Sequence, residues 1–241
     1  YANKKDPVEQ KKFEKGYRAL HAELKRTGMF KSNKLYYLYK VLSNVAIAAA
    51  SIYCAVSTDS LAWNIGGAVL MALFWQQCGW LAHDFLHHQV FDTRAYNDMM
   101  GIVIGTLFQG FSVHWWKGKH NAHHAVPNLH ASTPESHDGD PDIDTMPMLA
   151  WSAPMAAMGK DSAAAHFFIK WQSALYFPIL FFARLSWANE SMKMVFVPGG
   201  VSGVKGADDD QKNMQYPVLE QIGLGVHYSI LGSICYHMPG G

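Results

Sequence analysis

Cysteine is scarce in this sequence. The chain has three, Cys54, Cys78 and Cys235, each within an apolar stretch, and no two of them form a CxxC pair. This pattern excludes a disulfide framework and a zinc site built on cysteine thiolates. We interpret the three residues as small buried hydrophobic side chains.

Charge is also scarce, because only 16% of the 241 residues are charged whereas soluble domains carry about a quarter. The net charge of +1 hides an asymmetry: residues 1–40 contain 11 of the 20 Lys and Arg. Neither this balance nor any motif calls for nucleic acid. No signal peptide and no initiator methionine precede Tyr1, so we expect a piece of a longer protein.

Two long runs with almost no charge follow the basic segment, the first containing Lys40 as its single charged residue and the second containing none. Residues 1–37 predict a helical entry on the cytosolic side, and residues 38–57 and 61–82 predict transmembrane helices of the length that crosses a bilayer. The alternative is a pair of core helices in a soluble bundle. The excess of Lys and Arg before the first run places the N-terminus in the cytosol, and the short break at 57–60 on the opposite side.

The remaining segments complete an expected fold class: an all-α, integral membrane helical bundle with a cytosolic, histidine-rich cap, incomplete at its C-terminus. Residues 83–173 form the predicted cytosolic region. The apolar residues 174–188 contain Pro178 and Arg184 and predict an interfacial segment, with a span as the alternative. Residues 217–238 predict the start of a third transmembrane helix. We treat residues 1–241 as one partial domain.

Histidine, by contrast, is abundant and clustered. Six of the 13 histidines form two groups that lie 32 positions apart in the sequence. The first group is His83, His87 and His88, and the second is His120, His123 and His124. Residues three or four apart share a face of a helix, so members of each group can meet one metal ion. Imidazole is a ligand for iron, copper, zinc and nickel.

Six histidines without a nearby cysteine suggest two metal ions and oxygen chemistry, because one zinc site needs only four ligands. Asp84 and Asn121 lie inside the two groups, and are expected to orient imidazoles or to remain solvated. A nearby loop carries alternating aspartates, Asp138, Asp140, Asp142 and Asp144. It lacks the glycine and glutamate of a calcium-binding EF-hand loop, so we expect a structural loop near the site.

The residues around the histidines resemble a known family. The pattern HDxxHH at 83–88 followed by HNxHH at 120–124 is similar to the first two histidine boxes of the membrane fatty acid desaturases. The segments QCGWLAHD at 77–84 and DGDPDIDT at 138–145 resemble the front-end desaturases. The segments FEKGY at 13–17 and YFPIL at 176–180 are most similar to the Δ6 acyl desaturases of diatoms and related algae.

The resemblance implies two iron ions held by the six histidines at the cytosolic face of the endoplasmic reticulum membrane. It implies O2-dependent insertion of a cis double bond into acyl chains such as linoleoyl and α-linolenoyl, in long-chain polyunsaturated fatty acid biosynthesis. Partners would be a fatty acyl lipid or acyl-CoA, membrane lipid, and cytochrome b5 with its reductase as the source of electrons. Alternatives on the same scaffold are Δ5 or Δ8 desaturases, sphingolipid desaturases and hydroxylases.

Two departures from the family pattern bear on activity. The chain contains neither the His-Pro-Gly-Gly motif of a fused cytochrome b5 domain nor the Gln-x-x-His-His of a third histidine box. We therefore expect residues 1–241 alone to be inactive, and we do not assign His227 or His237 as ligands. A function of another class, a membrane zinc-binding or transport protein, predicts acidic or histidine residues inside the spans, and 38–57 and 61–82 contain none.

Overall fold

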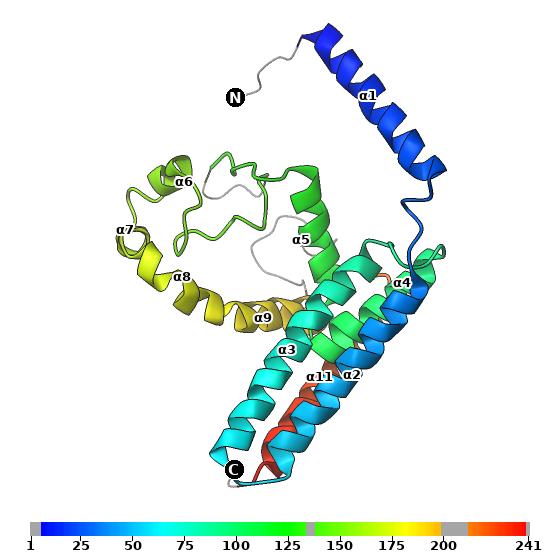
Figure 1. Ribbon diagram of the computed structural model, residues 1–241. Helices are drawn as coiled ribbons and strands as arrows, with labels where there is room; N and C mark the ends of the chain where they lie inside the picture. Colours follow the sequence, from blue (N-terminus) through cyan, green and yellow to red (C-terminus); the bar gives the residue numbers. More distant parts are fainter. Residues whose placement is uncertain (1–5, 134–137, 199–211, 240–241) are drawn as a thin grey trace.

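The computed structural model describes residues 6–133, 138–198 and 212–239. Within these ranges the regular structure is helical and no strand is present. The all-α prediction is therefore confirmed. The histidine-bearing helix α5 (Val113–Ala125) lies beyond the end of a helical bundle, opposite the turn that joins the two longest helices (Figure 1).

Helices α2 (Lys34–Val56) and α3 (Leu61–Leu86) form an antiparallel hairpin and are long and apolar enough to cross a membrane. Asn33 caps α2, because its side chain accepts a hydrogen bond from the backbone N–H of Tyr36 at 3.2 Å. Helix α2 begins four residues before the first apolar run seen in the sequence, and α3 ends four residues after the second run. As a result, His83 lies in the last turn of α3 rather than just after it.

Small residues hold this hairpin together. The Ser51 hydroxyl donates to the carbonyl of Gly67 at 2.7 Å. A Cβ atom on Gly67 would lie 3.0 Å from the Ser51 carbonyl and 3.2 Å from the Ala55 amide nitrogen. Close backbone approach through such residues is a principal source of helix association where lipid, not water, surrounds the helices.

Helix α4 (Arg94–Gly101) continues into a π-helix, η1 (Ile102–Gln109), which packs against α3 and against α11 (Pro217–His237). Gly110 ends η1 in the left-handed conformation, with φ 79°. His227 of α11 closes this end, because its Nδ1 lies 3.0 Å from the Leu107 carbonyl. The apolar residues 102–109 are thus largely buried against protein.

The helices that follow α5, as far as α9, form an arc beside this bundle, and the N-terminal helix stands apart from it (Figure 1). The elements of the arc are α6 (Ala153–Met158), α7 (Ala163–Lys170), α8 (Gln172–Phe181) and α9 (Ala183–Phe196). Helix α1 (Pro7–Arg26) and α8 bury no residue of their own. The arc contacts the bundle chiefly through α9, which packs on α5 and α11.

Candidate metal centre

The first half of the site is the C-terminal end of α3. His83 and His87 are four residues apart, and their ring centroids lie 4.4 Å from each other. The helix ends immediately after Leu86, and His87 is its C-cap. The helical spacing therefore brings these two imidazoles together, as the sequence predicts.

The second half of the site is α5, whose N-terminus is held by groups from two other helices. The Ser112 side chain caps α5 by accepting from the Trp115 amide at 3.2 Å, and its hydroxyl donates to Glu220 of α11 at 2.5 Å. Glu220 also accepts from the His114 amide at 3.1 Å. Ser191 of α9 accepts from the Ser112 amide at 2.9 Å. A buried carboxyl group at a helix N-terminus stabilises that end electrostatically and so fixes where α5 begins.

Four of the six predicted ligands converge between these two helices. One ring nitrogen from each of His83, His87, His120 and His124 lies within 4.8 Å of the others. The Nε2 atoms of His120 and His124 are 3.1 Å apart. The ring centroid of His87 is 5.0 Å from that of His120 and 4.7 Å from that of His124. Such a set of imidazole nitrogens can surround one metal ion.

An aromatic ring covers this four-imidazole cluster. Trp116 stacks on His120 with a centroid separation of 4.3 Å, and meets His83 and His87 edge-on at 5.8 and 5.9 Å. Burial, with the positive field of neighbouring imidazoles, lowers the pKa of His120 to about 4. The same causes lower the pKa of His87. Both imidazoles are therefore neutral near pH 7, which is the form that binds metal.

His88 lies outside the cluster. Its backbone has φ 57°, so the chain turns sharply where α3 ends. The turn directs His88 Nε2 to the buried carboxylate of Asp98, at 2.9 Å, and Lys117 also donates to Asp98 at 2.7 Å. Burial raises the pKa of Asp98, but its hydrogen bonds with Lys117 and His88 outweigh this and hold the pKa below its ordinary value.

His123 also lies outside the four-imidazole cluster, although its ring is next to those of His120 and His124. Its Nδ1 lies 2.9 Å from the carboxylate of Asp140 and 3.6 Å from that of Asp142. These three residues form a second group with closely spaced donor atoms. The aspartate loop is thus structural in part, and it also reaches a predicted ligand.

The two residues predicted to orient imidazoles differ in their surroundings. Asp84 accepts from the hydroxyl of Tyr37 at 2.9 Å and lies 3.4 Å from Nδ1 of His83. Asn121 is exposed on α5. Sequence reasoning missed Asp98 and Glu220. An acidic residue within an otherwise apolar helix is a signal that could have pointed to Glu220.

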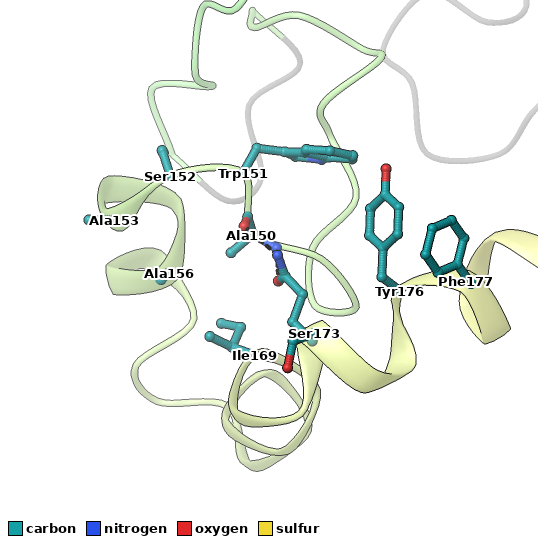
Figure 2. A pocket seen from close by; sticks show the side chains of 10 residues that line it. Ala150, Trp151, Ser152, Ala153, Ala156, Ile169, Ser173, Tyr176 and Phe177 are labelled. Atoms are coloured by element: carbon teal, nitrogen blue, oxygen red, sulfur yellow. Dashed lines mark hydrogen bonds between the residues drawn. The ribbon is translucent and has the colours of Figure 1, made fainter.

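A cavity of about 540 Å³, largely open to the surface, is lined by α6, the loop before it, and helices α7 and α8. In Figure 2 the rings of Trp151, Tyr176 and Phe177 stand at one side of it. Gln172 ties the loop to α8, because it accepts from the Ala150 amide and donates to the Ala150 carbonyl at 2.9 and 3.0 Å. None of the six predicted ligands lines this cavity.

Several known proteins are similar to this chain in sequence. Residues 59–199 match the family described as fatty acid desaturase. The acyl-lipid (9-3)-desaturase of Physcomitrium patens is 46% identical over 72% of this chain and 32% of its own length. The Delta(8)-fatty-acid desaturase of Euglena gracilis is 34% identical over 89% of the chain and 46% of its own length. The Delta(6)-fatty-acid desaturase of Caenorhabditis elegans is 36% identical over 78% of the chain and 41% of its own length.

No solved structure shows a significant match to the chain. The chain spans between about a third and a half of the length of these curated relatives. The family match nevertheless covers more than half of the chain and includes both histidine groups. The chain belongs to the fatty acid desaturase family.

Proposed function

We propose that the protein is an O2-dependent membrane desaturase that inserts a cis double bond, at the Δ6 position, into acyl chains such as linoleoyl and α-linolenoyl. The observation that carries this proposal is the four-imidazole cluster at the end of a candidate membrane span. The C–H bonds of a lipid tail have no adjacent polar group that could activate them, so the reaction needs a bound metal close to the membrane surface.

The residues present fit a metal ion. His87 Nε2 is buried and has no hydrogen-bond partner among the described residues, and an unsatisfied buried nitrogen is costly unless a ligand pairs with it. We propose that His83, His87, His120 and His124 hold one iron, and that His88 and His123 contribute to a second. When bound, the iron pair would supply the oxygen-activating chemistry that an unreactive C–H bond requires.

The chain's own residues prepare this site. Trp116 covers His120 and limits the access of water to the imidazoles. Tyr37 and Asp84 restrain His83 from the α2 side. Lys117 and Asp98 restrain His88. Residues that fix a ligand's orientation in this way preserve the geometry on which metal affinity depends.

The Δ6 position is supported by the resemblance of residues 13–17 and 176–180 to algal Δ6 enzymes, and by the Delta(6) relative from Caenorhabditis elegans. The relatives named as Delta(8) and (9-3) desaturases make other positions of the double bond the alternatives. We further propose an active site that faces the cytosol at the endoplasmic reticulum, and cytochrome b5 with its reductase as electron donor.

The test is expression of the full-length gene product in yeast fed linoleate, with fatty acids resolved by gas chromatography. We expect γ-linolenate in the wild type and none in a His120→Ala variant expressed at the same level. A different unsaturated product would replace the Δ6 assignment. Purified protein that binds zinc but no iron, and that leaves every fed acid unchanged, would overturn the desaturase proposal itself.

A further inference from the structure

The loop that follows α5 returns to place a buried carboxylate beside His123. The Asp140 side chain has no exposed surface. Both of its oxygens approach His123 Nδ1, at 3.0 and 2.9 Å. The two residues are 17 positions apart, so the contact depends on the path of the loop and not on helical spacing.

The carboxylate of Asp140 is itself fixed by the backbone. One oxygen accepts from the Asn128 amide at 2.7 Å and the other from the Asp142 amide at 2.9 Å. The Asp140 amide donates to the Leu129 carbonyl at 2.8 Å. Each carboxylate oxygen therefore acts as a hydrogen-bond acceptor, and the group has little freedom to rotate.

Because both Asp140 oxygens accept hydrogen bonds from backbone amides, the His123 Nδ1 that faces them is the donor and carries the hydrogen. In a neutral imidazole this leaves Nε2 with the free lone pair, which is the nitrogen able to bind a metal. The His123 ring lies next to the cluster, with its centroid 5.6 Å from that of His120 and 5.4 Å from that of His124. The chain thus places an imidazole of defined tautomer beside the four that converge.

We propose that Asp140 is a positioning residue that holds His123 in the Nδ1–H tautomer, so that His123 binds metal through Nε2. The inference rests on the proposed function for the identity of the metal, but not for the tautomer. Loss of such an outer partner costs about 10–100-fold in metal affinity. The competing arrangement is direct binding of a cation by Asp140, Asp142 and His123 Nδ1, whose donor atoms are also close together.

The first test is magic-angle-spinning NMR of the full-length, metal-free protein in liposomes, with ¹⁵N-labelled histidine. The His123 signals are identified by their loss in His123→Gln. We expect the Nδ1–H tautomer in the wild type, and a mixture of tautomers in Asp140→Asn. The Nε2–H tautomer in the wild type would refute the proposal, and this measurement requires no variant of Asp140 to fold.

The second test is a titration with Co²⁺ alone, a redox-stable probe of imidazole sites. Asp140→Asn should weaken binding by about 10–100-fold, and it should have no further effect in a His123→Gln background. Asp144→Asn, at an exposed carboxylate of the same loop, is the matched control and should leave affinity unchanged. Equal losses with and without His123 would show that Asp140 does not act through it. Neither the NMR measurement nor the Co²⁺ titration requires enzyme activity. Absence of desaturation in yeast would therefore count against the proposed function without counting against the role of Asp140.

Discussion

Replacing Glu220 with alanine should loosen the attachment of α5, the helix that carries His120 and His124. Glu220 is 2% exposed, and it accepts from the Ser112 hydroxyl and the His114 amide at 2.5 and 3.1 Å. Alanine leaves both donors buried without this acceptor, and each costs about 1–3 kcal/mol. We expect a total destabilisation of about 2–6 kcal/mol.

The measurement is the free energy of unfolding of the full-length protein in mixed micelles titrated with SDS, followed by tryptophan fluorescence. Glu220→Gln retains one acceptor oxygen and the size of the side chain, so it should cost less than alanine. Ser229→Ala changes an exposed side chain of α11 and should stay within about 0.5 kcal/mol of the wild type. An alanine variant as stable as this control would refute the reasoning, because it would mean that Glu220 does not hold α5 in lipid.

Three further predictions concern the cluster and the end of η1. His87→Ala should weaken Co²⁺ binding beyond the roughly 10–100-fold typical of an outer partner, whereas His21→Ala, at an exposed residue of α1, should not change it. Gly110→Ala should destabilise the fold by at least about 1–2 kcal/mol, because the backbone of Gly110 is left-handed. The added Cβ would also lie 2.3 Å from the His227 ring. A variant with unchanged resistance to SDS would contradict this prediction. The unfolded chain protonates His120 at a higher pH than the folded chain does, since the pKa falls from 6.5 to about 4. The stability of metal-free protein should therefore fall as pH drops through that window, and His120→Gln should flatten the dependence.

Local spacing accounts for the part of the site that the sequence predicts well. His83 with His87, and His120 with His124, are each four residues apart on a helix, so each pair follows from helical geometry alone. His88 could not be placed in this way. The helix ends before it, and a positive φ directs its ring to a different partner.

Contacts between distant segments account for what the sequence left open. The Asp140 carboxylate meets His123 only because the intervening loop folds back, and Glu220 meets Ser112 across 108 positions of sequence. Nothing in the alternating aspartates distinguishes the buried Asp140 from the exposed Asp142 and Asp144. The α2–α3 hairpin itself was predictable, because two long runs with almost no charge mark its helices.

The hydrogen bonds along the α2–α3 hairpin have a consequence for the orientation of the first histidine group. Tyr37 bonds Asp84, Lys40 bonds Gln77 at 2.9 Å, and Ser51 bonds Gly67. Contacts at three levels fix the rotational phase of α3 about its own axis, and each residue of an α-helix corresponds to about 100° of rotation. A slip of a single position inside the membrane would therefore turn His83 and His87 away from α5. The direction in which the His83 and His87 rings point therefore depends on the packing of the apolar α2–α3 hairpin as well as on the polar groups around the rings.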